Sequence, residues 1–273
     1  MPEERSYDVV VVGATGFTGR LVAEDLARPA PSECRWALAG RNRGRLEEVR
    51  TRLTAIDKRL ADLPLLHVDA ADPASVRSLA KAARVVATTV GPYTHRGGPL
   101  VAACAEAGTD YLDLAGEPEF VDTTYLRHHA KAEASGARLV HSCGFDSVPF
   151  DLGTYFTVHQ LPEEVPLRVD AYLRASGMVS GGTVHSVVAA FTRMGPAARA
   201  ARERRWVEAP PRARRARAVL GLPHRGLGMW ALPLPTIDPL TVARSAAALD
   251  RYGPDFAYRH FAAVKHLPVA VAG

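Results

Sequence analysis

Three glycines near the start of the chain are spaced for binding a phosphate group. Gly13, Gly16 and Gly19 form a GxxGxxG motif that follows a run of valines and precedes an amphipathic stretch. The motif therefore lies between a buried strand and a helix, the context in which such glycines bind a dinucleotide. The helix start adds free N–H groups and a positive dipole end. The predicted cofactor-binding residues of this loop are Gly13, Thr15, Gly16, Phe17, Thr18 and Gly19; an ordinary glycine-rich turn is the alternative.

The end of the second predicted strand indicates which dinucleotide binds. An NAD-binding domain usually places an acidic residue there, about 20 residues beyond the glycines. This chain instead has Gly40, Arg41 and Asn42 at that position, and none of them is acidic. A guanidinium group binds phosphate through two parallel hydrogen bonds, so Arg41 suits the 2′-phosphate of NADPH. We therefore predict NADPH rather than NADH, with these three residues at the cofactor; a solvated loop charge is the alternative for Arg41.

A third loop follows the fourth predicted strand. Ligands of open α/β sheets bind outside the carboxyl ends of the strands, so this loop should border the ribose and the nicotinamide. The Gly-Pro pair gives it a rigid backbone. Tyr93 could stack, donate a proton or simply pack. The predicted cofactor-binding residues of this loop are Thr89, Val90, Gly91, Pro92 and Tyr93.

Strands and helices alternate through the first half of the chain. Short apolar strands are predicted over residues 9–12, 35–39, 65–68, 84–90, 110–114 and 138–141, with helices over 17–26, 45–60, 73–82, 100–106 and 125–135. This alternation is typical of parallel βαβ units with both sheet faces covered. We predict an α/β fold, in which a Rossmann doubly wound parallel sheet binds the dinucleotide.

The alternation stops after residue 150. A longer strand is predicted over residues 167–175 and a helix over 183–194, followed by a Pro/Gly-rich passage over 209–239. The chain then ends on an apolar run without a closing helix or strand. We therefore predict two domains, a dinucleotide-binding domain over residues 1–150 and a truncated α/β substrate and dimerisation domain over 151–273.

Composition and charge are those of an ordinary globular protein. The 273 residues are 47% hydrophobic and 23% charged, which excludes a disordered, collagen-like or coiled-coil chain. The net charge of +5 comes from residues 193–225, which hold ten Arg and two acidic residues. Because the basic excess is confined to one stretch, we expect no nucleic-acid partner.

The cysteines and the lack of recognisable targeting segments indicate which cellular compartment to expect. Cys34, Cys104 and Cys143 form no CxxC pair, which argues against a disulfide framework and a structural zinc site. No cluster of His, Cys and carboxylate residues has metal-ligand spacing, so no metal is predicted. We see neither a signal peptide nor a stretch long enough for a transmembrane helix. A cytoplasmic protein is expected, with peripheral attachment to a membrane left open.

The motifs as a set resemble a known family. The segments VVVVGATGFTGRLVAEDLA, ALAGRNRGRLEEV, TTVGPYTHRGGPLVAACAEAGTDYLDLAGE and HSCGFDSVPFDLG are similar to the saccharopine dehydrogenase-like oxidoreductases, and closest to the trans-acting enoyl reductases of actinobacterial polyketide and lipid synthesis. The resemblance covers residues 7–153 almost continuously. It implies NADPH-dependent reduction of the α,β-double bond of an acyl thioester carried by a synthase that lacks this activity.

The resemblance leaves the catalytic residues open. Asp146 could orient the nicotinamide amide or cap the next helix, and Ser147 could cap that helix equally well. Tyr93 is the best candidate for polarising the thioester carbonyl or delivering the proton. Glu117 could belong to the same rim or to the surface. Asp146 and Tyr93 are the predicted catalytic residues; His141, His185 and Cys143 are interpreted as structural.

Two other functions remain as alternatives. An amino-acid C–N oxidoreductase, as in the saccharopine dehydrogenases proper, needs clustered Arg and polar side chains for its substrate, and the hydrophobic passage 226–235 fits a lipid chain better. A non-catalytic dinucleotide-binding scaffold is the second alternative. The expected partner is an acyl thioester, carried on an acidic carrier domain of a polyketide synthase that matches the Arg-rich stretch 199–217. A solvated basic face is the other interpretation of that stretch, and a homodimer is a further expectation.

Overall fold

The computed structural model describes residues 5–174, 194–208, 215–226 and 228–265. By its contacts the chain divides into two compact units, Met1–Cys143 with Gly195–Arg204, and Gly144–Met194 with Arg205–Gly273. The boundary predicted at residue 150 lies inside a helix, α7 (Val148–Val158). The assignment of domains to residues 1–150 and 151–273 stays a prediction. The helix predicted over 183–194 lies outside the described residues, apart from Met194.

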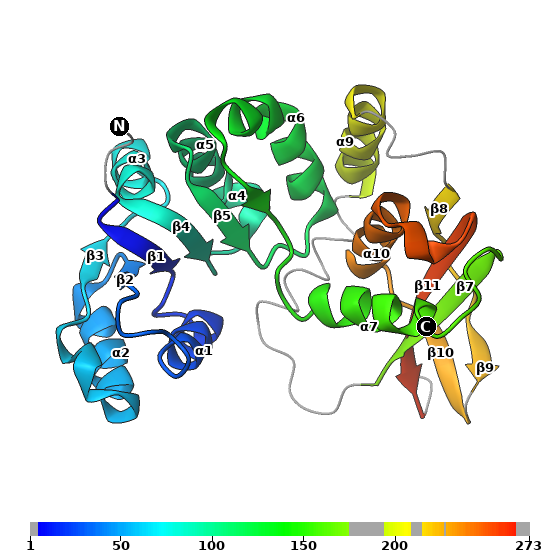
Figure 1. Cartoon of the computed structure of the whole chain (residues 1–273), viewed down its shortest axis with the longest axis horizontal. Helices are drawn as coiled ribbons and strands as arrows, with labels where there is room; N and C mark the ends of the chain where they lie inside the picture. The colour runs from blue at the N-terminus through cyan, green and yellow to red at the C-terminus, as the bar shows by residue number, and fades with distance from the viewer. Residues whose placement is uncertain (1–4, 175–193, 209–214, 227, 266–273) are drawn as a thin grey trace, which may run out of the picture. The chain divides into compact units, whose positions relative to one another are not determined.

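The first unit is built on a six-stranded sheet with the order β3-β2-β1-β4-β5-β6 (Figure 1). Every neighbouring pair in this sheet is parallel. The strand order is that of a doubly wound dinucleotide-binding sheet, which confirms the predicted Rossmann fold. The strands are β1 (Tyr7–Val12), β2 (Trp36–Gly40), β3 (Leu65–His67), β4 (Ala83–Thr88), β5 (Asp110–Asp113) and β6 (Leu139–Val140).

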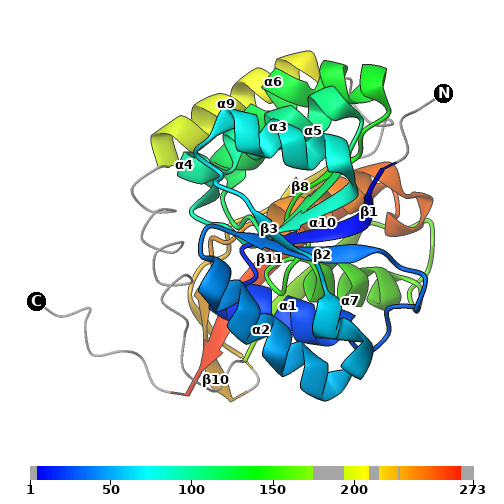
Figure 2. The same cartoon turned by 90° about the vertical axis from the view of Figure 1, so that its left-hand side faces the viewer.

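Helices cover both faces of this sheet, as Figure 2 shows. Successive side chains of a strand point to opposite faces, so Val11 packs with α1 and α2 in one apolar core, while Val10 packs in a second core with α3, α5 and α6. Burial on both faces explains the all-apolar strands of the sequence. The helices are α1 (Phe17–Leu26), α2 (Arg43–Ile56), α3 (Pro73–Ala82), α4 (Tyr93–Arg96), α5 (Gly98–Ala107) and α6 (Pro118–Ser135), with a 3₁₀ turn η1 (Lys58–Asp62).

Two helices differ from their predicted ranges by more than two residues at one end. The helix predicted over 125–135 begins at Pro118, because proline is well suited to the first helical position. The helix predicted over 45–60 ends at Ile56, where Asp57 adopts an extended backbone and its carboxylate accepts the N–H of Arg59 at 2.9 Å. Asp57 thus ends α2 and, through its side-chain hydrogen bond, begins the 3₁₀ turn η1.

The second unit is a mixed sheet with the order β7-β11-β10-β9, and β8 also pairs with β11. The parallel partners of β11 are β7 and β8, and its antiparallel partner is β10. A core that includes Val158, Val242 and Tyr258 lies between this sheet and its helices. The elements are α7, β7 (Leu167–Leu173), β8 (Arg215–Ala218), β9 (His224–Gly226), β10 (Met229–Pro233), α10 (Asp238–Ala248), η2 (Asp250–Tyr252) and β11 (Asp255–Val264).

One helix from the second half of the chain packs on the first unit. Helix α9 (Met194–Val207) lies beside α6 (Figures 1 and 2). Its Arg204 is buried, donates to the Asp122 carboxylate at 2.9 Å, and places its guanidinium carbon 4.1 Å from the centroid of the Tyr125 ring. An ion pair and a cation–π contact therefore hold α9 against α6.

Candidate functional site

The glycine loop joins the end of β1 to the start of α1. Gly13 has a φ of +85°, a backbone conformation that side chains disfavour, and a Cβ there would lie 2.8 Å from the Val90 side chain. A Cβ at Gly19 would overlap the carbonyl oxygen of Gly13 and lie 2.8 Å from its carbonyl carbon. The loop, the helix and the end of β4 are thus in direct contact, as the glycine spacing predicts.

Gly16 has more space for a side chain than Gly13 and Gly19 have. The nearest atom to a Cβ at Gly16 would be the Gly13 oxygen at 3.4 Å, which the protein tolerates far better than the overlap at Gly19. Gly16 is also the N-cap residue of α1 and makes no side-chain capping bond. The first N–H groups of a helix lack intrahelical acceptors, so those of Phe17, Thr18 and Gly19 remain available to an anion. Phe17 and Thr18 are exposed and Thr15 is half-buried.

The end of β2 lies next to this loop, since β2 pairs with β1. Arg41 is exposed and forms no hydrogen bond or ion pair with another described residue. Asn42 has a structural role, because its side-chain oxygen accepts the N–H of Arg45 at 3.0 Å and caps α2. Gly40 ends the strand, and a Cβ there would make an ordinary 3.6 Å contact with Leu46. Arg41 is therefore a cationic side chain without a bonded partner among the described residues, at the position where a 2′-phosphate is predicted to lie.

The end of β4 completes the same edge of the sheet. The Thr89 N–H donates to Val12 at 3.0 Å, and the Thr89 hydroxyl lies 3.3 Å from the carbonyl oxygen of Gly13. Beyond it, Val90, Gly91 and Pro92 lead into the short helix α4. The predicted binding segments at the ends of β1, β2 and β4 thus meet at one carboxyl edge, where open α/β sheets bind ligands.

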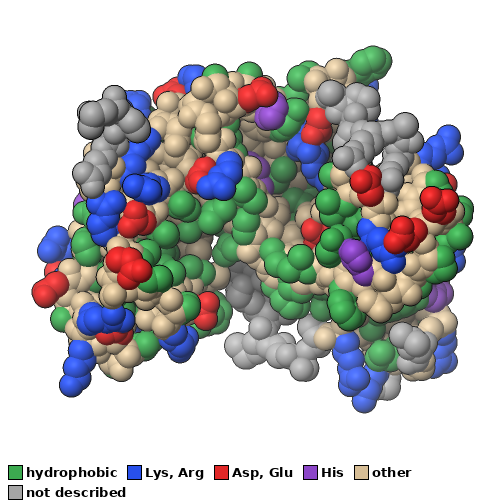
Figure 3. Space-filling view, in the orientation of Figure 1, with side chains coloured by type: hydrophobic (Ala, Val, Ile, Leu, Met, Phe, Trp, Pro, Cys, Tyr) green, Lys and Arg blue, Asp and Glu red, His purple; other side chains and the backbone are tan. Residues whose placement is uncertain are grey.

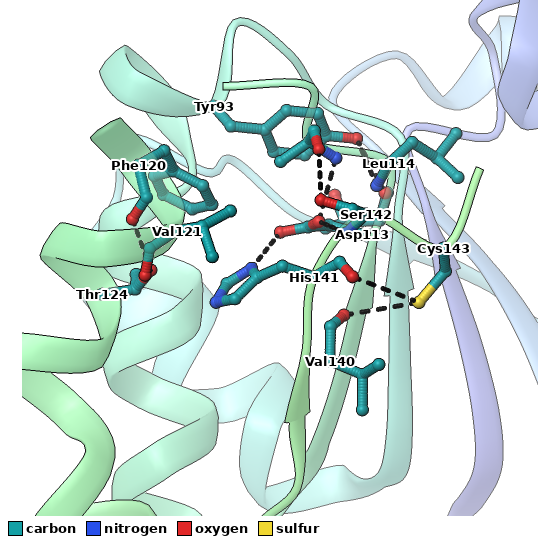
Figure 4. A network of polar contacts seen from close by, with 12 residues as sticks. Tyr93, Asp113, Leu114, Phe120, Val121, Thr124, Val140, His141, Ser142 and Cys143 are labelled. Atoms are coloured by element: carbon teal, nitrogen blue, oxygen red, sulfur yellow. Dashed lines mark hydrogen bonds and ion pairs between the residues drawn. The ribbon is translucent and has the colours of Figure 1, made fainter. Parts of the chain in front are cut away.

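The Tyr93 phenol is engaged within the protein. Tyr93 is 6% exposed, its hydroxyl donates to the carbonyl of Thr88 at 3.1 Å, and it accepts the N–H of Leu114 at 3.3 Å (Figure 4). Burial raises the pKa of this phenol well above its usual value. The contacts link the ends of β4 and β5, which is the packing role that the sequence left open. Its catalytic assignment stays a prediction.

Glu117 holds the loop in which Tyr93 lies. Its buried carboxylate accepts the N–H of Tyr93 at 3.0 Å and the N–H of Thr94 at 2.6 Å, and it also bonds the Thr94 hydroxyl. A carboxylate at a helix start satisfies N–H groups that lack intrahelical partners. The sequence leaves open whether Glu117 lies at the rim of the cofactor site or on the protein surface. In the structure its side chain is buried, because α4 and α6 begin beside one another.

A second carboxylate fixes the ends of β5 and β6. Asp113 is 1% exposed, and it accepts the N–H groups of Ala115 and Ser142 at 2.9 Å each. Its other oxygen lies 2.7 Å from Nδ1 of His141, whose ring points toward α6 in Figure 4. Ser142 has a φ of 61°, which these bonds and its hydroxyl bond to Ala115 at 2.6 Å hold in place. The structural interpretation of His141 fits this bond to Asp113 and stays a prediction.

Asp146 and Ser147 lie at the start of the second unit. Ser147 is the N-cap residue of α7, yet it makes no capping bond, so the capping role considered for it is wrong. Its hydroxyl is buried and 3.5 Å from that of Thr241. Asp146 is exposed and accepts no hydrogen bond from another described residue. Partial desolvation raises the pKa of its carboxyl group. Its catalytic role stays a prediction.

The second unit also holds a buried Asp–His pair that the sequence analysis missed. Asp238 is 1% exposed and His260 is 3% exposed, and Oδ2 of the first lies 3.7 Å from Nδ1 of the second. Thr236 bonds Oδ2 of Asp238, but Oδ1 and both ring nitrogens of His260 have no hydrogen-bond partner. Burial raises the pKa of Asp238 to about 7, with a contribution from the charge of Asp146, and lowers that of His260 to about 4. The pair is favoured as a neutral acid beside a neutral imidazole.

One cavity of the described chain lies away from this edge. A cavity of about 360 Å³ is lined by residues including Tyr7 and Trp36, the first residues of β1 and β2, so it opens at the opposite edge of the sheet. Among the described residues no group of His, Cys, Asp and Glu could hold a metal ion. Burial raises the pKa of the Cys143 thiol, in agreement with its structural interpretation. No helix of the described ranges is long and apolar enough to cross a lipid bilayer.

Comparison with known proteins agrees with this geometry. Residues 9–140 match the saccharopine dehydrogenase NADP binding domain. Over 188 residues, 67% of the chain, it is 46% identical to trans-acting enoyl reductases of Mycobacterium leprae and Mycobacterium tuberculosis. The match covers 44% of each, so the chain spans less than half the length of these curated relatives. Apo histidine-tagged saccharopine dehydrogenase (L-Glu forming) from Saccharomyces cerevisiae resembles it with a TM-score of 0.47 and 16% identity, over 56% of this chain and 31% of that chain.

The family model and the curated relatives indicate the class of protein. Residues 9–140 belong to the saccharopine dehydrogenase NADP binding domain family, and the first unit has the Rossmann fold. Within that family the chain is similar to the trans-acting enoyl reductases. The family and the NADPH cofactor predicted from the motifs are confirmed, while the roles of individual site residues stay predictions.

Proposed function

We propose that this chain is an NADPH-dependent oxidoreductase that reduces the α,β-double bond of an enoyl thioester in trans to a polyketide or lipid synthase. The similarity to proteins named trans-acting enoyl reductase carries this proposal. NADPH supplies the hydride for such a reduction. The chain itself must bind the cofactor, orient the substrate and provide a proton.

The described residues fit NADPH. The free N–H groups at the start of α1 would bind the pyrophosphate, since Gly16 leaves that helix end uncovered. The exposed Arg41 would bind the 2′-phosphate. The loop from Thr89 to Tyr93 would border the nicotinamide ribose, because it lies at the carboxyl end of the strand next to β1.

Proton delivery is assigned to Asp146, with Tyr93 as a positioning residue. A carboxyl group whose pKa is raised by desolvation holds a proton closer to neutral pH. The Tyr93 hydroxyl already donates a hydrogen bond to the carbonyl oxygen of Thr88, so Tyr93 supports the loop at the end of β4. The substrate would be an acyl thioester on a carrier domain, and a homodimer remains an expectation of the proposal.

Cofactor binding is tested first, by titrating the protein and two variants with NADPH and NADH. Arg41→Ala should weaken NADPH binding about tenfold and leave NADH binding unchanged, because only NADPH carries the 2′-phosphate. Gly16→Ala should weaken both cofactors by at least about tenfold while the melting temperature of the free protein stays within a few degrees. An equal loss of both cofactors in Arg41→Ala would remove the 2′-phosphate assignment.

Turnover is tested next, with an enoyl group on N-acetylcysteamine and NADPH oxidation as the readout. Asp146→Asn should lower kcat by about 100-fold without changing NADPH affinity, as expected for loss of a proton donor. NADPH binding without turnover on any enoyl thioester would instead support the scaffold alternative.

A further inference from the structure

Helix α9 has one buried and one exposed face. Ala200 and Arg204 are buried against the first unit. Arg199, Arg202 and Trp206 follow one another at spacings of three and four residues, so they share the opposite face. All three are exposed, and the Trp206 side chain is 86% exposed. We call Arg199, Arg202, Arg205 and Trp206 the α9 face.

The charges of the α9 face are not used within the described structure. Arg199, Arg202 and Arg205 form no hydrogen bond or ion pair with another described residue. Some exposed arginines elsewhere are paired, as Arg43 is with Glu47 at 3.1 Å. In the view of Figure 3, basic and acidic side chains are interspersed over the first unit. The α9 face therefore gathers three positive charges that have no bonded partner among the described residues, with Glu203 as the one acidic side chain of the helix.

The residue types of the α9 face are those of binding hot spots. Trp and Arg are the residues most enriched where protein interfaces gain their energy. Arg204 fixes the helix to α6 through Asp122 and Tyr125, so the face is presented on a rigid support and little ordering is needed on binding. The support belongs to the NADP-binding unit.

We propose that the α9 face is a docking surface for the acidic carrier domain that presents the acyl thioester. This inference rests on the proposed function and adds the position of its partner surface. Positive charge on α9 attracts the acidic domain and its phosphopantetheine phosphate, and complementary charge raises the association rate and sets orientation. Trp206 supplies the apolar contact at one end of the charged row.

A protein surface fits the α9 face better than a lipid surface does. An interfacial membrane helix carries a broad apolar face of Trp, Phe and Leu opposite its basic residues. The face of α9 opposite its exposed arginines is instead buried against the first unit, and Trp206 and Val207 are the large exposed hydrophobic residues of the helix. Membrane binding is therefore kept as a competing outcome of the test.

The experiment compares one enoyl group on two carriers. The substrates are the enoyl thioester of N-acetylcysteamine and the same group on the holo carrier domain of a synthase module without an active enoyl reductase. Arg199→Glu/Arg202→Glu should lower kcat/KM at least about tenfold on the carrier-bound substrate and less than about twofold on the small thioester. Arg52→Glu/Lys58→Glu is the matched control, since both are exposed and the change in charge is equal; it should leave both substrates unaffected.

An unchanged kcat/KM on the carrier-bound substrate, or an equal loss on both substrates, would overturn the docking proposal. Failure of the proposed function is seen separately, as no turnover of either substrate by the unaltered protein. Docking is then decided by direct binding of the carrier domain to the protein.

Trp206 reports that binding, because Trp36 is buried and Trp230 is half-buried. Adding the carrier domain should reduce acrylamide quenching of the protein, but not of Trp206→Phe or of Arg199→Glu/Arg202→Glu. Protection by phosphatidylglycerol vesicles and none by the carrier domain would assign the α9 face to a membrane and overturn the proposal.

Discussion

The dipeptide Asp-Pro begins one helix in each unit, and the two aspartates lie in opposite environments. Asp72 precedes α3, is exposed, and accepts the N–H groups of Ala74 at 2.9 Å and Ser75 at 3.3 Å. Asp238 is the first residue of α10 and is 1% exposed, with His260 as its buried neighbour. Proline explains both helix starts, whereas the ionisation of each carboxyl group depends on what packs around it.

The contrast extends to the two units. In the first unit, loop carboxylates such as Asp113 and Glu117 are buried but accept several N–H groups each. In the second unit, Tyr258 and His260 bury polar atoms that have no hydrogen-bond partner. Buried polar groups with partners stabilise a unique local geometry, and those without partners cost free energy. The first unit thus holds its sheet edge with carboxylates that have several partners, although the Tyr111 hydroxyl there is also buried without one. The second unit contains a buried acid and a buried imidazole whose pKa values are shifted toward one another.

The largest effect is expected at the packed glycine of the first unit. Gly19→Ala should destabilise the protein by about 3 kcal/mol, because the new Cβ overlaps backbone atoms of Gly13 that cannot move independently. Gly153→Ala in α7 is the matched control, since no atom lies within 4 Å of a Cβ there, and it should be neutral or stabilising. Urea unfolding measures both. A Gly19→Ala protein as stable as the parent would contradict the packing of α1 on the loop.

The buried pair should produce opposite pH dependences when it is separated. Burial raises the pKa of Asp238 from 3.8 to about 7, so this group alone makes stability fall as pH rises through that window. Burial lowers the pKa of His260 from 6.5 to about 4, so this group alone makes stability rise between pH 4 and 6.5. In the intact pair the two slopes cancel over the shared range.

Single variants should reveal each slope. Relative to the parent, the free energy of unfolding of His260→Phe should fall by up to about 1.4 kcal/mol per pH unit from pH 4 to 6.5, and that of Asp238→Asn should rise by up to that amount per unit over the same range. The double variant should restore the parental pH dependence. Urea midpoints across this range measure it, and parallel curves for all four proteins would show that the pair does not hold one shared proton.

A smaller effect is expected for the carboxylate that caps α4. Glu117→Gln should destabilise the protein by about 2 kcal/mol, because a charge-assisted acceptor of the Tyr93 and Thr94 N–H groups is replaced by a neutral amide. Glu48→Gln, at an exposed position of α2, should change stability by less than about 0.5 kcal/mol. Equal effects of the two substitutions on the melting temperature would argue against a buried cap.

The smallest effect belongs to the exposed member of the Asp-Pro comparison. Asp72→Ala should cost about 1 kcal/mol through loss of the cap of α3, and Asp72→Asn should restore most of it, because asparagine caps equally well. Asp238→Asn, by contrast, should change the pH dependence of the free energy of unfolding. If Asp72→Asn changed the pH profile as strongly, the two environments would not differ as the structure shows.

Much of the first unit could be predicted because its signals are local. Valine runs, helical apolar spacing and the Gly13–Gly19 motif each concern a few adjacent residues, and all reappear in the observed strands, helices and turn. The start of α6 at Pro118 was missed because the helix signal there is weak until Tyr125. The site segments came together as expected, since parallel strands place their carboxyl ends at one edge.

Local sequence patterns were enough to predict the doubly wound sheet, the glycine loop and NADPH as the cofactor, because those depend on short-range patterns with few structural solutions. The folded chain was needed to show that Tyr93 donates to Thr88, that Glu117 is buried, and that Arg204 pairs with Asp122, 82 residues away. It likewise decided that Asp238 and His260 meet in a core. The hydrogen bonds and pKa of a side chain depend on neighbours brought together by folding, and no local pattern encodes those neighbours.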